Sequence, residues 1–316
     1  NRDQYFSTLF DSCKSSDGAL YQIPVTFGVC GILAKESDVG EGRKGFTYDQ
    51  YNEFVDTVCN GKNPIIRDKS DFVINCLASG YVTYMNEGNV DFDTDEFRML
   101  VEYANENIFD ELEDDDQGFM GLGMQGMLSD GAMEYEASSA IEFINVASSE
   151  NEKLMIYGYP SAKECGPCAE IYTSAAISAM ADEDTQKAAW GFIKAMLSED
   201  VQSKESMGNP VNKAAYEKVT MKAIGLYNEQ YDLFVTMGMS DAMMKMYGFT
   251  KVDDSLAQDY IDIANAVENV MMGDTAVASI VQEELGAYFS GQKSIDDVIN
   301  IINDRSQTVV NERASL

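Results

Sequence analysis

The stretch Asp17-Gly-Ala-Leu-Tyr-Gln-Ile-Pro-Val-Thr-Phe-Gly-Val-Cys-Gly-Ile-Leu-Ala-Lys35 decides the fold of this chain. It opens with an Asp-Gly turn signal, because glycine tolerates the positive φ that a tight reversal requires. Two β-rich runs follow, at residues 20–23 and 25–33, and Pro24 stands between them. Proline donates no hydrogen bond to a sheet ladder, so we expect the first run to end there or to lie on an edge. Such a segment is typical of a chain that crosses between two lobes past a cleft, with Phe27 as an exposed aromatic side chain.

Length and composition narrow the class of protein. A chain of 316 residues exceeds the usual size of one hydrophobic core, so we expect two lobes. A hydrophobic content of 45% is typical of a globular protein. The chain has 22 Lys and Arg against 54 Asp and Glu, and its net charge of -32 excludes general nucleic-acid binding, which needs a basic surface. The same charge disfavours anionic membrane surfaces and suits a soluble, secreted protein.

The sequence contains no histidine. It therefore lacks the commonest general base and the commonest transition-metal ligand, which excludes serine triads and histidine-based zinc sites. Six cysteines are too few for a disulfide scaffold at this length, and the closest pair supplies two of the four ligands that a structural zinc needs. We expect neither a bound metal nor a cofactor.

Hydrophobic periodicity predicts a largely helical chain with a few strands. Thr47 and Gln50 match a capping box at the start of one helix, which Gly61 ends. Further helices are expected over residues 70–84, after 91–95, over 184–197, in most of the chain from 213 onward, and after a cap at 294–297. Strands are expected over residues 132–144 and 153–159, and a strand followed by a turn is expected over 169–180. The acidic run 110–116, which leads into a Gly- and Met-rich stretch, is expected to be a solvated loop.

Three local motifs are compatible with special chemistry. Cys165-Gly-Pro-Cys168 occurs in thioredoxin-type enzymes, in which a helix N-terminus lowers the pKa of the first thiol, but a β-like segment follows it here. Asp91-x-Asp-x-Asp95 imitates a calcium loop, although Glu96 occupies the position that requires glycine, so we interpret the aspartates as helix caps. The third motif is a run of potential Cu(I) ligands without nearby Cys or His, which we interpret as packing residues: Met237, Met239, Met243, Met244 and Met246.

The opening stretch and several later segments resemble one family. Asp17-Gly-x-Leu-Tyr-x-Ile-Pro24 followed by an apolar strand resembles the first inter-lobe crossover of extracellular solute-binding proteins of family 1, the maltose-binding-like components of ABC importers. Later segments resemble the return crossing, the helix and loop after it, and the C-terminal signature: Gly158-Tyr-Pro160, Tyr172-Thr-Ser-Ala-Ala-Ile-Ser178, Ala188-Ala-Trp-Gly-Phe-Ile-Lys194, Gly208-Asn-Pro-Val-Asn-Lys213, Glu283-Glu284 and Tyr288-Phe-Ser-Gly-Gln-Lys-Ser294. The similarity spans essentially the whole chain.

The resemblance implies an α/β fold with two lobes, of the type II periplasmic-binding-protein kind, with crossover strands between the lobes and a helix-rich C-terminal part. Family members carry βα units of the first lobe before the crossover, whereas 16 residues precede Asp17 here, so we expect an incomplete first lobe. Residues 1–24 and 156–212 are expected to form the remainder of that lobe. Residues 25–155 and 213–316 are expected to form the larger lobe with the hinge and the C-terminal helices.

The implied function is that of a non-enzymatic, extracellular substrate-binding protein. Such a protein binds a sugar or oligosaccharide between its lobes, closes around it, and delivers it to the membrane permease of an ABC importer. The family is anchored to the bacterial cell surface by a lipid, which implies the same location here. An incomplete first lobe predicts weak sugar binding and self-association through the exposed edge at residues 172–178.

Cleft side chains are the expected ligand contacts, because carbohydrate recognition combines flat aromatic rings with polar groups that fix the hydroxyls. The candidates on or near the expected crossings are Phe27, Tyr157, Tyr159 and Tyr172, with Thr26, Glu170 and Thr173 as polar partners. For each of them, core packing or contact between lobes is an equally open interpretation. Trp190 lies in a helical Ala-Ala-Trp-Gly-Phe-Ile pattern, so we interpret it as a packing residue.

Two other functions stay open. The first is a thiol–disulfide oxidoreductase that uses Cys165 and Cys168. The second is a glycan-processing hydrolase, which needs two carboxylates at a defined separation. With 54 acidic residues, the sequence always offers some such pair, so the pattern of acids decides nothing.

Overall fold

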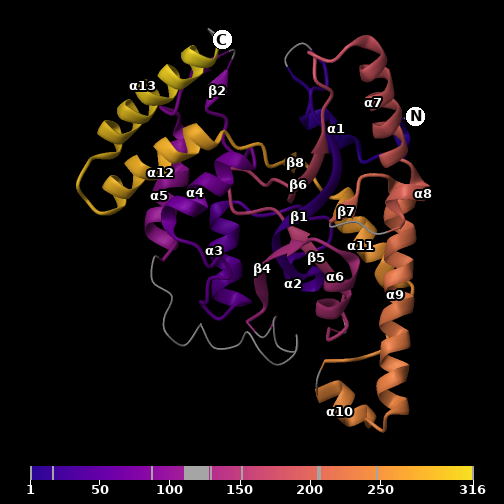
Figure 1. The fold of residues 1–316 in the computed structure, drawn as a ribbon. Coiled ribbons are helices and arrows are strands. Elements are labelled where there is room, and N and C mark those ends of the chain that lie inside the picture. Colours follow the sequence, from indigo (N-terminus) through magenta and orange to yellow (C-terminus); the bar gives the residue numbers. More distant parts are fainter. Residues whose placement is uncertain are drawn as a thin grey trace. The chain divides into compact units, whose positions relative to one another are not determined.

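The computed structural model describes residues 2–15, 18–86, 88–109, 128, 130–150, 152–204, 208–246 and 248–314. The predicted loop at 110–116 lies outside the described residues, as does most of the Gly- and Met-rich stretch after it. The chain divides into two compact units, drawn in Figure 1. Unit 1 comprises Asn1–Lys44, Gly121–Gly158 and Gly166–Val270, and unit 2 comprises Gly45–Met120, Tyr159–Cys165 and Met271–Leu316.

The boundaries of these units differ from the predicted lobe boundaries. Unit 1 contains residues 1–24 together with 25–44 and 213–270, which the resemblance assigned to the other lobe. The assignment of residues to the lobes of the family therefore stays a prediction.

The sheet of unit 1 is built around one long strand. The 13-residue strand β1 pairs antiparallel with β4, β5, β6 and β7, and β6 also pairs in parallel with β8. The bounds of these strands are β1 Ile23–Lys35, β4 Ala132–Ala137, β5 Leu154–Tyr157, β6 Cys168–Ala175, β7 Asn209–Pro210 and β8 Asn269–Val270. The apolar stretch at residues 23–35 therefore forms the central strand of this sheet.

An end of the strand at Pro24 is wrong, because β1 continues through it, whereas the alternative of an edge position fits, because within the described residues Pro24 pairs on one side only. Pro24 lies opposite Ser174 of β6, as the second residue of the strand. A proline near the start of a strand removes few ladder hydrogen bonds. The register shifts between Pro24 and Thr26, and again between Thr26 and Phe27, so irregular pairing accommodates the ring without ending the strand.

Helices complete unit 1, with bounds η1 Arg2–Gln4, α1 Ser7–Ser12, α2 Glu36–Val39, α6 Ala140–Ala147, α7 Glu183–Met196, α8 Glu199–Gln202, α9 Lys213–Thr236, α10 Asp241–Met246 and α11 Ser255–Asn265. One prediction fails here, because residues 132–144 are not strand throughout: β4 ends at Ala137 and α6 begins at Ala140. Phe143, Ile144 and Ala147 repeat at helical spacing from Ala140, and all four are buried. That period of 3.6 residues favours a helix over a strand.

The core of unit 1 contains a series of packed aromatic rings. Phe143 packs on Tyr260 at 5.0 Å between ring centroids, and Tyr260 packs on Tyr216 at 5.2 Å. Tyr216 stacks on Phe27 of β1 at 6.1 Å. The Tyr216 hydroxyl donates a hydrogen bond to the Tyr260 carbonyl oxygen, which satisfies a polar group that burial would otherwise leave unpaired. Strand β1 is thus held from one side by helices α6, α9 and α11.

Unit 2 consists mainly of helices, with bounds α3 Tyr48–Thr57, α4 Lys69–Ala78, α5 Asp95–Asn107, α12 Thr275–Phe289 and α13 Ile295–Ala314, and two short strands, β2 Met85–Asn86 and β3 Asn89–Val90. The predicted capping box of Thr47 and Gln50 is confirmed. The predicted cap at Ser294 is also confirmed, since its hydroxyl accepts a hydrogen bond from the Asp297 amide. The interpretation of the aspartates at 91–95 as helix caps is wrong, because Thr94 caps α5 and Asp95 lies in its first turn.

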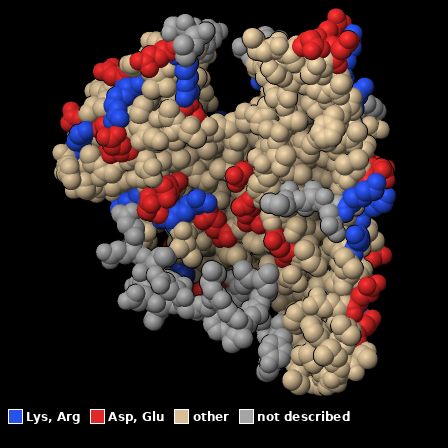
Figure 2. Space-filling view, viewed as in Figure 1, with Lys and Arg blue, Asp and Glu red and all other residues tan. Residues whose placement is uncertain are grey.

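Several basic side chains form ion pairs with acidic ones. Figure 2 shows basic side chains in small groups beside acidic ones on the face that it draws. Arg98, for example, contacts Asp93 and Asp296 at 2.7 Å each. Within the described residues, no helix combines the length and the apolar character needed to cross a membrane.

Candidate functional site

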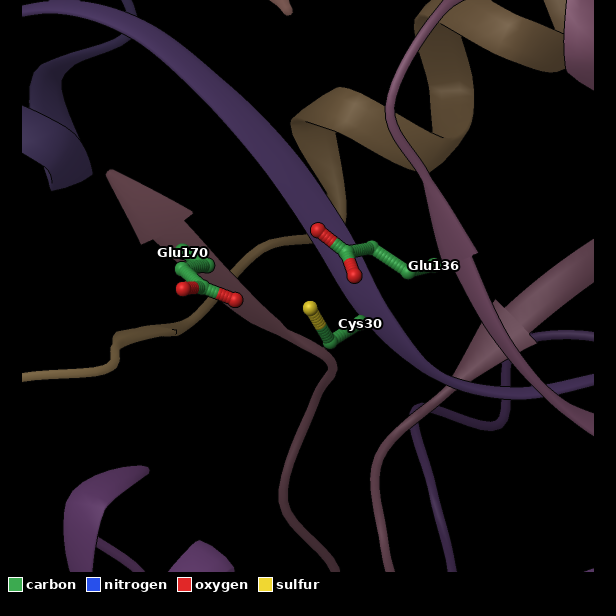
Figure 3. Close-up of side chains that lie close together, drawn as sticks. All are labelled: Cys30, Glu136 and Glu170. Atoms are coloured by element: carbon green, nitrogen blue, oxygen red, sulfur yellow. The ribbon is translucent and has the colours of Figure 1, made fainter. Parts of the chain in front are cut away.

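The candidate site lies on one face of the unit 1 sheet, where three neighbouring strands bring polar side chains together. The register sets Cys30 of β1 opposite Glu136 of β4 on one side and opposite Cys168 of β6 on the other. Directly opposed residues in a sheet point to the same face, so these three form one row across the strands. Glu170 lies two residues after Cys168 and projects from that same face. Figure 3 shows Cys30, Glu136 and Glu170 pointing toward one another.

Tyr172 occupies an irregular position on β6 beside this row. Phe27 pairs with Ile171 and Thr26 pairs with Thr173, so β6 advances two residues while β1 advances one. Tyr172 is therefore the extra residue of a β-bulge. Bulges re-aim side chains and occur often beside functional sites. The tyrosine side chain remains 37% exposed.

Two glycines make room for the Tyr172 side chain. A Cβ atom at Gly28 would clash with the Tyr172 hydroxyl and would lie 3.0 Å from a Glu136 oxygen. A Cβ atom at Gly208 would lie 2.5 Å from the Tyr172 ring. The ring therefore rests directly on glycine backbone, and its hydroxyl donates a short hydrogen bond to the Glu136 carboxylate.

The electrostatics of the site follow from this packing. Partial burial and the hydrogen bond to Glu136 raise the pKa of Tyr172, so the phenol stays protonated at neutral pH. A hydrogen bond with Cys168, burial and the nearby carboxylates raise the pKa of the Cys30 thiol. Glu136 and Glu170 are exposed, whereas Cys30 is 7% exposed. The site thus presents one aromatic ring and two carboxylates above a buried pair of thiols.

The seven predicted ligand-contact residues divide by exposure. Glu170, Tyr172 and Thr173 are exposed on β6, where Glu170 and Tyr172 contribute to the site just described. The other four, Thr26, Phe27, Tyr157 and Tyr159, are buried. The role of each of the seven in ligand binding stays a prediction.

The predicted exposure of Phe27 is wrong. Its side chain has no exposed surface and packs in the aromatic core, because the alternation of β1 turns it away from Gly28 and Cys30. Thr26 lies near the site: its Cβ atom is 3.2 Å from the point that a Gly208 Cβ would occupy. Its buried hydroxyl has no hydrogen-bond partner among the described residues. Tyr159 belongs to unit 2, where its amide donates to the Tyr81 hydroxyl.

Sequence reasoning missed two members of the site, Cys30 and Glu136. The alternation Met-Glu-Tyr-Glu in residues 133–136 signals a strand with one polar face, and this is the pattern that could have indicated Glu136. The pattern alone does not reveal that β4 pairs with β1. Cys30 sits in a nearly continuous apolar run, which hides the alternation between the two faces of β1.

The Cys165-Gly-Pro-Cys168 motif lacks the structural setting of a thioredoxin-type enzyme. Cys168 begins strand β6 and is fully buried, whereas activation of such a thiol needs a following helix. Cys165 is half-buried in the preceding segment. All six cysteines lie in the described part of the chain, and none is half of a disulfide. The structural partner of Cys168 is Cys30, which lies 138 residues away in the sequence.

The interpretation of Trp190 as a packing residue is wrong. Its side chain is 43% exposed, and the Lys194 ammonium lies 5.8 Å from the ring centroid. The Trp190 ring lines a cavity of about 930 Å³ in unit 1, together with Tyr5, Phe10 and Lys213 among others. The sequence period predicts a broad buried stripe on α7. In the structure, Ile193 is the residue of this helix that is buried.

Comparison with known proteins shows the fold. No protein-family model matches the sequence, and no curated protein matches it. The chain is similar to the solved structure of the sugar-binding protein MalE from Xanthomonas citri, with a TM-score of 0.61 and 12% identity over 99% of this chain and 76% of that chain. It is also similar to a cyclic alpha-maltosyl-1,6-maltose binding protein from Arthrobacter globiformis, with a TM-score of 0.53 and 14% identity over 98% and 77% of the two chains.

A third similar structure is a periplasmic oligogalacturonide binding protein from Yersinia enterocolitica, with a TM-score of 0.52 and 13% identity over 98% of this chain and 77% of that chain. At such identities, structural similarity shows the fold alone. The chain therefore has the two-lobe, α/β fold of periplasmic sugar-binding proteins, as the sequence predicted. Neither the oxidoreductase nor the hydrolase gains support from these comparisons.

Proposed function

We propose that this protein is the substrate-binding component of an ABC importer and that its ligand is a sugar or an oligosaccharide. The observation that carries the proposal is the placement of Tyr172, an exposed aromatic ring on a β-bulge next to Glu136 and Glu170. It occurs in a fold whose solved relatives are binding proteins for sugars and oligosaccharides.

The chemistry of this face suits a carbohydrate. An aromatic ring packs against the apolar face of a pyranose, and carboxylate oxygens accept hydrogen bonds from sugar hydroxyls. The hydrogen bond from Tyr172 to Glu136 holds both side chains in place before any ligand arrives, which lowers the entropy lost on binding. The ring and the carboxylates therefore form a preorganised polar and aromatic platform.

Delivery to a permease is the second part of the proposal. In a two-lobe binding protein, ligand binding favours a closed state, and the closed state is the one that docks on its partner. We place the protein outside the bacterial cytoplasm, attached to the cell surface by a lipid. Recovery of the mature protein from membrane and secreted fractions, before and after lipase treatment, tests this location.

Self-association is proposed through the edge of β6. That strand runs to Ala175, and its parallel ladder with β8 covers Cys168 and Ala169. Unpaired strand edges invite pairing with a second chain. Light scattering across a concentration series tests it: a dimer that dissociates on dilution is expected, and a monomer at all concentrations would contradict it.

A thermal-shift screen against monosaccharides, maltooligosaccharides and uronic-acid oligomers tests the ligand class. A ligand that binds the folded state raises the apparent Tm, by an amount that grows with its concentration relative to Kd. The Tyr172→Ala variant should lose the shift that the best ligand produces in the parent protein. Tyr21→Ala, which removes a tyrosine that is 68% exposed elsewhere in unit 1, is the matched control and should keep it. The proposal fails if no saccharide shifts the Tm of the parent chain, or if Tyr172→Ala responds as the parent does.

The same screen separates the proposed function from the two enzymatic alternatives. A binding protein returns its ligand unchanged, so incubation should release no new reducing ends from oligosaccharides. It should also leave the disulfides of insulin intact. Turnover in either assay, beyond the level of a Cys168→Ser or Glu170→Gln variant, would contradict the non-enzymatic role.

A further inference from the structure

We propose that Cys30, Glu136 and Glu170 bind a divalent transition metal ion of the zinc type as its three protein ligands. The inference concerns the buried side of the platform and does not rest on the sugar-binding function. Nothing in the sequence pattern predicted it, because Cys30 lies far from Cys168 in the sequence, whereas Cys165 and Cys168 are three residues apart.

The distances within the cluster approach those of a metal site. The Cys30 sulfur and one carboxylate oxygen from each glutamate all lie within 4.8 Å of one another. A tetrahedral zinc with bonds of about 2.3 Å to sulfur and about 2.1 Å to oxygen sets its ligand atoms about 3.6 Å apart. A contraction of about 1 Å therefore forms the site. Glu136 and Glu170 are exposed, so rotation about their side-chain bonds can supply it.

The backbone holds the side chains of this cluster in fixed relative positions. Glu136, Cys30 and Cys168 form one row across β4, β1 and β6, and strands hold side chains more rigidly than loops do. Gly28, the neighbour of Cys30 on this face of β1, has no side chain, so the Tyr172 hydroxyl lies over it beside Glu136. Figure 3 shows the three labelled side chains converging from three different strands.

The donor set selects the class of metal. One thiolate and two carboxylates suit zinc and its chemical analogues, whereas calcium and magnesium take oxygen ligands alone. Tyr172 donates a hydrogen bond to Glu136 and so orients a ligand, as outer partners do in known metal sites. Two carboxylates close to buried sulfur repel each other without a cation, and a bound ion removes that cost. On binding, the Cys30 thiol releases its proton to solvent.

Cobalt is the probe of choice, because Co²⁺ replaces zinc and absorbs light when thiolate binds it. The full chain, reduced with a phosphine and freed of metal, is titrated with Co²⁺ and then with Zn²⁺. We expect one equivalent of Co²⁺ with a sulfur-to-cobalt charge-transfer band, which Zn²⁺ abolishes on displacement. No sugar is present, so the result does not depend on the proposed function.

Matched variants assign the ligands. Cys30→Ser should abolish the charge-transfer band or shift it strongly, and Glu136→Gln and Glu170→Gln should each weaken Zn²⁺ binding by at least about tenfold. Cys165→Ser removes a half-buried thiol outside the row, and Glu217→Gln removes an exposed carboxylate on α9, so both should bind as the parent does. Circular dichroism and the Tm of each variant confirm that the chain is folded.

Two results would overturn the proposal. The first is a reduced, folded parent chain that shows no charge-transfer band, or a Cys30→Ser variant that keeps it. The second is a stable Cys30–Cys168 disulfide in protein purified without reductant, detected by peptide mapping, combined with no cobalt binding after reduction. In that case the row is a redox-sensitive thiol pair and not a metal site.

Discussion

The two faces of strand β1 differ in what their residues do. On one face Phe27, Val29 and Leu33 are fully buried and pack against the helices of unit 1. On the other face Gly28 and Cys30 lie beneath the carboxylates and the ring of Tyr172. Residues of β1 therefore alternate between two roles: one face stabilises the core, and the other face lies at the candidate site. A shift of one residue along β1 should therefore change the effect of a mutation from loss of stability to loss of binding.

The largest difference is expected between Phe27→Ala and Tyr172→Ala. Phe27 packs against Phe6 at 5.5 Å between ring centroids and against Tyr216 at 6.1 Å. Deleting a fully buried phenylalanine side chain costs about 3–5 kcal/mol. Tyr172 is partly exposed at a bulge, so its removal should cost about 1 kcal/mol or less while it weakens ligand binding at least about tenfold. Urea denaturation of both variants measures the costs, and equal losses of stability would contradict the division between the faces.

Two glycines of β1 provide the next test. A Cβ atom at Gly31 would clash with the backbone carbonyl of Tyr157 in β5, and backbone moves at a high cost. We expect Gly31→Ala to destabilise unit 1 by about 3 kcal/mol. A Cβ atom at Gly28 meets the Tyr172 side chain instead, which can swing outward, so Gly28→Ala should cost about 1 kcal/mol.

The readout for the glycine pair is twofold. Thermal unfolding should separate Gly31→Ala from the parent clearly and Gly28→Ala only slightly. Binding of saccharide or of Co²⁺ should fall in Gly28→Ala, because the displaced Tyr172 no longer holds Glu136. A stable Gly31→Ala variant would show that β1 and β5 are packed less tightly than their register indicates.

Glu284 in unit 2 is a carboxylate with a structural role, and it can be compared with Glu136 at the candidate site. Glu284 is buried and accepts hydrogen bonds from Lys293 and Arg305, which lower its pKa. A carboxyl group with a lowered folded pKa adds stability that is present above its unfolded value of about pH 4.3 and is lost as the pH falls through the folded pKa. Glu136, by contrast, is exposed and makes no ion pair with the described residues.

We therefore expect Glu284→Gln to cost about 1–2 kcal/mol at neutral pH, which is between the values for surface and buried ion pairs. The same variant should flatten the fall in stability below about pH 4. Glu136→Gln should leave stability within about 0.5 kcal/mol. Unfolding curves collected from pH 3 to 7 measure the free energy of unfolding of both variants. If Glu284→Gln loses as much stability below about pH 4 as the parent does, the ion pair contributes nothing.

The smallest effect is expected at Cys165. This thiol is half-buried outside the sheet, so Cys165→Ser should change stability by no more than about 0.5 kcal/mol. Cys168→Ser places a hydroxyl at a fully buried position of β6 and should cost about 1–3 kcal/mol. Denaturation of the two single variants decides whether Cys168 belongs to the fold, and equal behaviour would contradict its placement in the row.

Local features of the fold could be predicted from the sequence, because their causes are local. The capping box of Thr47 and Gln50 and the cap at Ser294 each depend on residues three positions apart. The central strand was also recognisable from its apolar, β-branched run. The possible end of the strand at Pro24 was not observed, because a strand can contain a proline where its register shifts.

The candidate site could be predicted only in part, because it depends on strand register. Glu170 and Tyr172 were selected from their place on an expected crossing, whereas Cys30 and Glu136 join them through pairing between segments about 100 residues apart. No single-sequence pattern specifies which strands pair. The bulge that makes Tyr172 special is likewise a property of two strands together.

Calorimetric titration of the best saccharide from the screen, into the parent chain, Tyr172→Ala and Tyr21→Ala, tests the proposed binding platform most directly. The parent and Tyr21→Ala should bind with equal Kd. Tyr172→Ala should bind at least about tenfold more weakly, which corresponds to about 1.4 kcal/mol, with its folding stability nearly unchanged. Equal affinity in all three proteins would contradict the assignment of this face of the sheet as the ligand site.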